Sequence, residues 1–304
     1  MKVIAGIDGT ERGDNAIVYA CQLLSPGVDE VQFYYSPPHV LPFARLEPET
    51  MALAKESLVK AIFTKAAERL PDGLKPGTDS TIVGEKRAWD GILAAADDIS
   101  AELIVVGAHS STRRLQLFLG GTARKVAYNS NVPVLIVREK QEPIADSLRV
   151  LVLCDDEKDW RRAAKSLEKF TLPADSRVTL FHVVETLSDE DVAQFTHAAK
   201  ESVPNSESLI KDYTSHVEAQ RASSHQRMQQ NREELPEIVQ QAESKVVQGH
   251  VIDEVVREVR DAHIDLVVVG ARRHNSVGRF LGSTTEALLT QCPCSLLIVH
   301  EPPG

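Results

Sequence analysis

The chain has 304 residues, of which 42% are hydrophobic and 26% are charged, and its formal net charge at pH 7 is −10. This length predicts two domains of about 150 residues each. The acidic balance argues against a nucleic-acid binder, because phosphate contacts require clustered Lys and Arg. No apolar run reaches the roughly 20 residues of a membrane span, and no leader segment precedes the first strand pattern, so we expect a cytoplasmic protein.

Strand patterns alternate with helical patterns along the first half of the chain. The predicted strands are 3–7, 31–35, 80–83, 103–107 and 134–137, and the predicted helices are 15–24, 47–70, 89–99 and one that follows the glycines at 120–121. Strands that alternate with helices imply a parallel, doubly wound sheet with helices on both faces. We therefore predict an α/β domain with a five-stranded parallel sheet.

The same order begins again after a polar segment at 138–147, which we interpret as a linker. The predicted strands are 150–153, 178–184, 245–247, 266–270 and 296–299, and the predicted helices are 160–170, 206–235, 252–262 and one after Gly282. This internal repeat predicts two tandem domains, residues 1–140 and 148–304. Asp8 and Asp155 are 147 residues apart, whereas Gly107 and Gly270 are 163 apart. The second copy thus carries 16 more residues, which we assign to its long middle helix.

The stretch 103–137 contains the parts of a phosphate-binding site. An apolar strand ends at Gly107, a polar loop follows, and Gly120-Gly121-Thr122 begins a helix. Glycines let backbone N–H groups approach an anion, and a helix N-terminus adds about half a positive charge. The second half repeats the pattern with Gly270 and Gly282-Ser283-Thr284.

These motifs resemble those of the universal stress protein family in its tandem, two-domain form. That family has Asp-Gly-Ser/Thr at the end of the first strand, where this chain has Asp8-Gly9-Thr10, and Gly-x2-Gly-x9-Gly-Ser/Thr after the fourth strand. The resemblance implies an adenine nucleotide alpha hydrolase-like fold, with the two domains packed as a pseudo-dimer through their last strands, 134–137 and 296–299. It also implies an ATP site, with Mg²⁺, in which the glycine loop holds the phosphates and the first-strand Asp faces the nucleoside.

The first half keeps most of the family's motif, with two departures. Ser110 replaces the second glycine, and Gly121 replaces the Ser/Thr, although Thr122 follows directly. The resemblance assigns the following nucleotide-binding candidates to the first half: Asp8, Gly9, Thr10, Gly107, Ser110, Gly120, Gly121 and Thr122. The alternative is a glycine loop that turns the chain and begins a helix without binding a ligand.

The second half departs further from the motif. It has Asp155-Asp156-Glu157 after its first strand and Arg273 in place of the second glycine, and its glycine loop is one residue shorter. The matching candidates are Gly270, Gly282, Ser283 and Thr284. Because neighbouring carboxylates repel phosphates, we expect this site to be degenerate and ATP to bind in the first half only.

Cys292-Pro293-Cys294 invites a redox or metal interpretation. One residue separates the two cysteines and no histidine cluster accompanies them, which is a weak pattern for either chemistry. The family places an ordinary cysteine at the position of Cys294. We therefore interpret the pair as structural.

The function that the sequence favours is a cytoplasmic stress-response sensor or scaffold that binds ATP and is not an enzyme. The alternative is an interaction module with both sites empty, which acts through helix surfaces such as 206–235 on partner proteins or takes another small ligand. A slow nucleotide hydrolase ranks third, because Asp8 is the one candidate general base. The residues leave open which proteins are partners and whether two chains form a homodimer.

Overall fold

Each half of the chain alternates strands with helices. The computed structural model describes residues 1–37, 47–71, 74, 76–84, 87–108, 119–138, 147–155, 159–186, 192–194, 197, 206–230, 232–271 and 281–300. The first half contains β1 (Lys2–Ile7), α1 (Glu11–Cys21), β2 (Glu30–Tyr35), α2 (Pro48–Ala67), β3 (Pro76–Val83), α3 (Ala88–Asp98), β4 (Leu103–Gly107), α4 (Gly121–Asn129) and β5 (Val134–Val137). The second half contains β6 (Arg149–Leu153), α5 (Asp159–Lys165), the 3₁₀ helix η1 (Ser166–Lys169), β7 (Arg177–Glu185), α7 (Ser206–Gln229), the 3₁₀ helix η2 (Arg232–Glu234), α8 (Glu237–Gln240), β8 (Glu243–Gly249), α9 (Val251–Asp261), β9 (Leu266–Ala271), α10 (Ser283–Gln291) and β10 (Ser295–His300).

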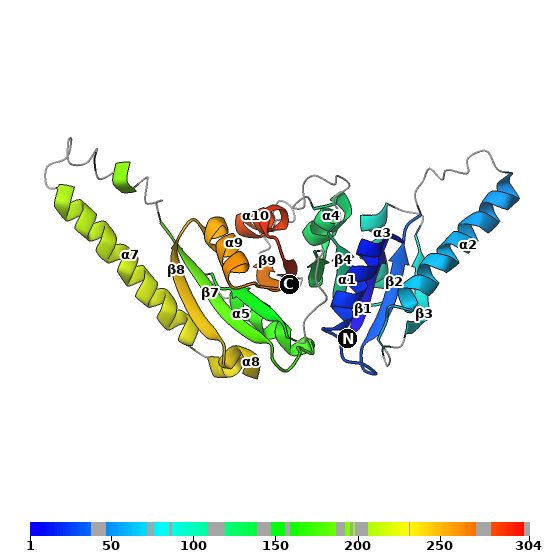
Figure 1. Ribbon diagram of the computed structural model, residues 1–304, viewed down its shortest axis with the longest axis horizontal. Helices are drawn as coiled ribbons and strands as arrows, with labels where there is room; N and C mark the ends of the chain where they lie inside the picture. Colours follow the sequence, from blue (N-terminus) through cyan, green and yellow to red (C-terminus); the bar gives the residue numbers. More distant parts are fainter. Residues whose placement is uncertain are drawn as a thin grey trace.

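The strands of both halves join into one sheet. Across the described part of the chain it has ten strands in the order β3-β2-β1-β4-β5-β10-β9-β6-β7-β8. Neighbouring strands within each half are parallel, as in the pairs β1–β4 and β6–β9, whereas β5 and β10 pair antiparallel where the halves meet. Figure 1 shows the halves side by side, with the long helices α2 and α7 at opposite ends of the molecule. The predicted α/β fold and the predicted pairing of the last strands are confirmed.

An approximate two-fold axis relates the two halves at this seam, by which we mean the β5–β10 pair and the side chains that cross it. The sequence offset of 162 that relates Gly120 to Gly282 also relates Leu135 to Leu297. These two equivalent leucines pair with each other across the seam. Because each strand covers the edge of the other, neither half exposes β5 or β10 as a free edge.

Helices cover both faces of the sheet. One apolar layer packs beneath α1, α2, α5, α7 and α8, and the other beneath α3, α4, α9 and α10. Successive residues of a strand enter opposite layers, so Ile104 packs in one and Val105 in the other. A strand buried on both sides must be apolar at every position, which accounts for the unbroken run in β4. No helix among the described residues combines the length and the hydropathy that a bilayer crossing requires.

Two sequence predictions about local structure are wrong in detail. The helix predicted at 15–24 begins four residues earlier, at Glu11, because the Thr10 hydroxyl caps it by accepting the N–H of Gly13 at 3.2 Å. The 16 additional residues of the second half do not all lie in its middle helix. That helix, α7, has 24 residues against 20 in α2, and the short elements η2 and α8 follow it before β8.

Arg138 does not belong to a polar linker, as the sequence predicted, but is buried at the seam. Its backbone N–H donates to Ser295 Oγ at 3.2 Å, and its Nη2 donates to the Leu289 carbonyl oxygen at 2.6 Å. The equivalent residue of the second half, His300, has its Nε2 at 2.8 Å from the carbonyl oxygen of Ala127. Each half therefore anchors its last strand to the last helix of the other half. The rest of the predicted linker, 139–146, lies outside the described residues.

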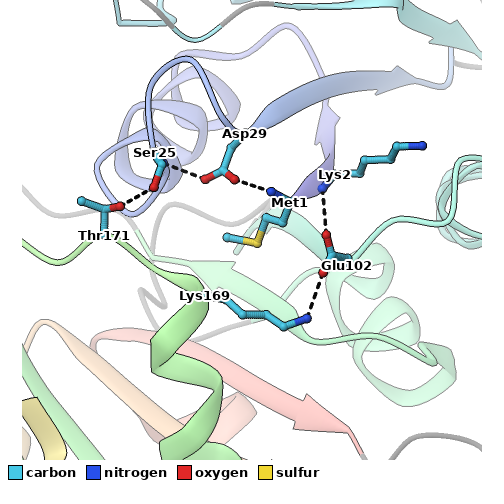
Figure 2. A network of polar contacts seen from close by, with 7 residues as sticks. All are labelled: Met1, Lys2, Ser25, Asp29, Glu102, Lys169 and Thr171. Carbon is cyan, nitrogen blue, oxygen red and sulfur yellow. Dashed lines mark hydrogen bonds and ion pairs between the residues drawn. The ribbon is translucent and has the colours of Figure 1, made fainter. Parts of the chain in front are cut away.

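A second set of polar contacts joins the halves away from the seam (Figure 2). Asp29 accepts the backbone N–H of Ser25 at 2.7 Å, and the Ser25 hydroxyl lies 2.6 Å from the hydroxyl of Thr171 in the second half. Lys169, also in the second half, donates to Glu102 at 3.0 Å. The hydrogen bond from Lys169 holds the pKa of Glu102 below its usual range. These contacts position Ser25 and Glu102 of the first half against residues 169–171 of the second half.

Candidate functional site

A cavity lies at the carboxyl ends of β1 and β4 in the first half. The two strands are paired and parallel, so they end at the same edge of the sheet, where open α/β folds bind ligands. The cavity has a volume of about 330 Å³. Five of the sequence-predicted site residues line it: Asp8, Gly107, Gly120, Gly121 and Thr122. Residues that are about 100 positions apart in the chain thus meet around one cavity.

The turn after β1 holds the Asp8 carboxylate in place. Its Oδ1 accepts the Thr10 backbone N–H at 2.9 Å and the Thr10 hydroxyl at 2.7 Å. Gly9 between them has φ +75°, a conformation that glycine adopts without strain. Gly9 and Thr10 do not themselves line the cavity. Their role in the structure is to orient Asp8 and to begin α1.

The start of α4 offers unoccupied backbone donors to the cavity. Gly120 is the N-cap residue, and no side chain caps the helix by a hydrogen bond. The first turn carries no acidic residue, and a Cβ atom at Gly121 would have no neighbour within 4 Å. The N-terminus of a helix carries partial positive charge and free N–H groups. An anion can therefore approach this helix end closely.

Tyr34 also lines this cavity, and the sequence analysis missed it. The residue is 2% exposed, and its hydroxyl has no hydrogen-bond partner within the described part of the chain. A Cβ atom at either Gly84 or Gly91 would lie 1.6 Å from the hydroxyl oxygen, so both glycines are needed to admit the phenol. Burial, and then the nearby Asp90, raise the pKa of Tyr34. The hydroxyl therefore stays protonated and can donate a hydrogen bond.

The sequence carried little signal for Tyr34 because it is one apolar-looking residue within strand β2. The remaining unpredicted lining residues include Ser36, which follows β2, and Ile92, which lies in α3. The predicted candidate Ser110 lies outside the described residues. In the part of the chain that the structure describes, no three or more His, Cys, Asp or Glu side chains gather as a metal site.

The second half has a larger cavity at the equivalent edge, with a volume of about 1020 Å³. All four predicted candidates of this half line it: Gly270, Gly282, Ser283 and Thr284. Asp155 and Glu185 add carboxylates to the lining, while Arg227 from α7 adds a cation. The neighbouring residues Asp156, Glu157 and Arg273 lie outside the described residues. The two cavities therefore differ in size and in charge.

Comparison with known proteins agrees with this architecture. The sequence model of the Universal stress protein family matches the chain twice, over residues 1–138 and 147–300. The crystal structure of a universal stress protein from Archaeoglobus fulgidus DSM 4304 is similar with a TM-score of 0.60 at 16% identity, covering 98% of this chain and 98% of that chain. A Pseudomonas aeruginosa UCBPP-PA14 protein assigned to the same family has a TM-score of 0.56 at 12% identity, covering 98% of this chain and 92% of that chain. No curated protein matches the chain.

Proposed function

Because the chain belongs to the universal stress protein family, we propose that its first half binds an adenine nucleotide and that the protein serves as a stress-response sensor, not an enzyme. The observation that carries the proposal is the cavity of the first half, which unites Asp8, Gly107 and the glycine-led start of α4. We keep residues 1–140 and 148–304 as the two domains. We place the protein in the cytoplasm, where its four cysteines, none of which forms a disulfide, would stay reduced.

The lining residues fit the three parts of an adenine nucleotide. The N–H groups at the start of α4 would bind the phosphates, and the Asp8 carboxylate would accept hydrogen bonds from the ribose hydroxyls. The buried Tyr34 hydroxyl, which has no hydrogen-bond partner among the described residues, would donate to a ring nitrogen of the base. Ile92 and Val106 supply apolar surface beside it. Mg²⁺ would enter with the phosphates, since this ion is usually held by one or two carboxylates together with substrate phosphates.

The residues of this cavity favour binding over hydrolysis. A hydrolase needs a general base that takes a proton from a positioned water. Asp8 is the one carboxylate in the described lining, and its Oδ1 already accepts two hydrogen bonds from Thr10. We therefore expect ATP turnover at background rate, and phosphate release that is abolished by Asp8→Asn would contradict this expectation.

Titration calorimetry of ATP with Mg²⁺ into the nucleotide-free protein tests the proposal. Gly121→Val is the variant of choice, because a Cβ atom at this position would have no neighbour within 4 Å and the added side chain would start in open space beside the start of α4. Ser283→Val changes the equivalent position in the second half and is the matched control. We expect about one site per chain in the wild type, unchanged binding in Ser283→Val, and an affinity at least tenfold weaker in Gly121→Val. No heat at millimolar ATP, or wild-type binding by Gly121→Val, would overturn the proposal.

The size of the second cavity favours a second candidate function, binding of a different small molecule in the second half. Its volume is about 1020 Å³ against about 330 Å³ in the first half. The carboxylates of Asp155 and Glu185 disfavour phosphates there. Native mass spectrometry of the purified chain tests this candidate. A copurified mass that persists in Gly121→Val and is lost in Ser283→Val would assign the ligand to the second half, and the reverse pattern would assign it to the first.

A further inference from the structure

Two thiols lie against each other beneath a surface turn at the seam. Cys292 follows α10 and Cys294 precedes β10, and their Sγ atoms are 3.5 Å apart. Neither cysteine forms a disulfide bond, and the two are 0% and 5% exposed. Gln291, which precedes the pair, is exposed, and Pro293 between the two cysteines is half-buried, so the turn that carries the thiols reaches the surface. A movement of roughly 1.5 Å would bring the sulfur atoms to disulfide bonding distance.

A buried arginine from the first half lies beside this pair. The Arg138 side chain donates to the Leu289 carbonyl oxygen at 2.6 Å. Within the described residues no carboxylate pairs with its guanidinium, and its Nε makes no hydrogen bond. A guanidinium cannot lose its proton, and a buried cation without a counter-ion is costly. Among the described residues, Cys292 and Cys294 are the neighbours that could supply negative charge, and both act to raise the pKa of Arg138 against the effect of burial.

The environment of Cys292 differs from that of the other buried cysteines. The hydrogen bond from Cys294, and then the charge of Arg138, hold the pKa of Cys292 below its usual value although burial opposes this. Burial raises the pKa of Cys21 to about 12 and also raises that of Cys154. The carboxyl end of α10 disfavours a thiolate, but the Arg138 guanidinium binds a carbonyl of that end and offsets its charge. These directions favour the thiolate, the reactive form of a cysteine, at Cys292 over Cys21 and Cys154.

The packing of the seam does not require thiols at this place. At the equivalent positions of the first half, Ser130 and Val132 replace Cys292 and Cys294, and His300 stands where Arg138 stands. His300 makes the equivalent crossing contact to the last helix of the other half. The same junction is therefore built at the other end of the seam without a thiol or an arginine. The thiol pair and Arg138 therefore occur together at one end of the seam and are both absent from the equivalent positions at the other end.

We propose that Cys292 and Cys294 form a dithiol site that small hydroperoxides oxidise to a disulfide. The Cys292 thiolate attacks the peroxide oxygen, the O–O bond breaks, and the leaving oxygen takes a proton and departs as an alcohol, or as water when the oxidant is hydrogen peroxide. Cys292 then carries a sulfenic acid. The Cys294 sulfur attacks the Cys292 sulfur, the S–O bond breaks, and hydroxide leaves with the Cys294 proton as water. The two thiols lose two protons and two electrons in all, and the hydroperoxide takes up both and is reduced.

Mass spectrometry of the intact, reduced chain after brief treatment with hydrogen peroxide tests the proposal. The remaining thiols are alkylated in denaturant, and trypsin releases 280–304, which contains both cysteines and no further cleavage site. We expect a disulfide, detected as a loss of two hydrogens from this peptide, to form about tenfold faster or more than Cys154 becomes resistant to alkylation. Dithiothreitol should return the peptide to its reduced mass. Cys21 and Cys154 serve as internal controls within the same chain.

Substitutions of Arg138 separate electrostatic activation from mere proximity of the thiols. Arg138→Gln should slow disulfide formation about fivefold, whereas Arg138→Lys, which keeps the charge, should stay within about twofold of the wild type. Circular dichroism and protection of Cys154 verify that each variant is folded. If Arg138→Gln does not fold, Cys294→Ala takes its place in the test. This variant should accumulate sulfenic acid at Cys292 under the same treatment. Oxidation of 280–304 no faster than of Cys154 in the folded wild type would overturn the proposal.

Discussion

Arg124 and Glu286 occupy equivalent positions in the two halves and form an ion pair with each other, with Arg124 Nη2 2.7 Å from Glu286 Oε1. An exact two-fold axis would place identical residues opposite each other at this point, and identical charges repel. A tandem chain can instead place an arginine in one half and a glutamate in the other. The pair therefore favours contact between a first half and a second half over contact between two copies of the same half.

Reversing the charge at one member of this pair should weaken the seam. We expect Arg124→Glu to lower the free energy of unfolding by about 0.5–1 kcal/mol, because both side chains are partly exposed and exposed ion pairs contribute little. The double variant Arg124→Glu/Glu286→Arg should return to within about 0.3 kcal/mol of the wild type. Urea unfolding of Arg124→Glu, Glu286→Arg and the double variant measures this, and a double variant whose loss equals the sum of the two single losses would contradict it.

The same pair should make a small contribution to stability that depends on pH. The hydrogen bond with Tyr128, and then the Arg124 charge, hold the pKa of Glu286 below its usual range in the folded state. A lowered folded-state pKa stabilises the protein above the unfolded-state pKa, and this contribution is lost as the pH falls through the folded-state pKa. Glu286→Gln should therefore be less stable than the wild type at pH 7, and this difference should be smaller at about pH 3, where the carboxyl group takes up its proton. Urea midpoints at the two values check this, with Glu218→Gln on the exposed side of α7 as the control.

Removing the Tyr34 hydroxyl should separate ligand binding from folding. Tyr34→Phe keeps the ring between Gly84 and Gly91 and removes a buried donor that has no partner within the described residues. We expect stability to stay the same or to rise by up to about 1 kcal/mol, since an unsatisfied buried group is lost. The affinity for ATP should fall about twofold to tenfold, the value of one hydrogen bond. Thermal unfolding and calorimetry measure the two effects, and an unchanged affinity would remove Tyr34 from the proposed site.

The two leucines on the approximate axis should be equally important for stability. Leu135 and Leu297 are each 0% exposed and pair across the seam. Leu135→Ala and Leu297→Ala should each cost about 2–5 kcal/mol, the usual range for a leucine truncated in a packed core. Leu53→Ala, at a position that is 64% exposed, should change the free energy of unfolding by less than about 0.5 kcal/mol. Seam variants no less stable than Leu53→Ala would show that the halves fold without this contact.

Local sequence patterns were sufficient to predict the fold class and the position of the first cavity. The apolar run 103–107 predicts a strand that is buried on both faces, and the alternation of such strands with helices leaves a parallel, doubly wound sheet as the natural arrangement. In such a sheet, parallel strands end at a common edge. The Asp8 turn and the glycines at 107 and 120 follow strands of that kind, so their meeting could be expected from the order of elements.

Contacts between residues far apart in the chain were decided by the tertiary structure. Tyr34 has no sequence signal for a binding role, because its hydroxyl is buried among residues of other elements and finds no partner in the part of the chain that the structure describes. Arg138 follows a strand in a polar stretch, and its burial depends on the second half, which supplies Leu289 and Ser295.

The cysteines show the same division between local pattern and assembled structure. The spacing of Cys292 and Cys294 could be read from the chain, and by itself it was weak support for any chemistry. The neighbouring guanidinium belongs to Arg138, which is more than 150 positions away, so the spacing of the cysteines gave no sign of it. Periodicity and turn chemistry are local and appear in the sequence, so they determined the strands, the helices and the repeat. Burial and electrostatic surroundings are sums over neighbours in space, so only the assembled sheet of both halves decided which polar groups lie together.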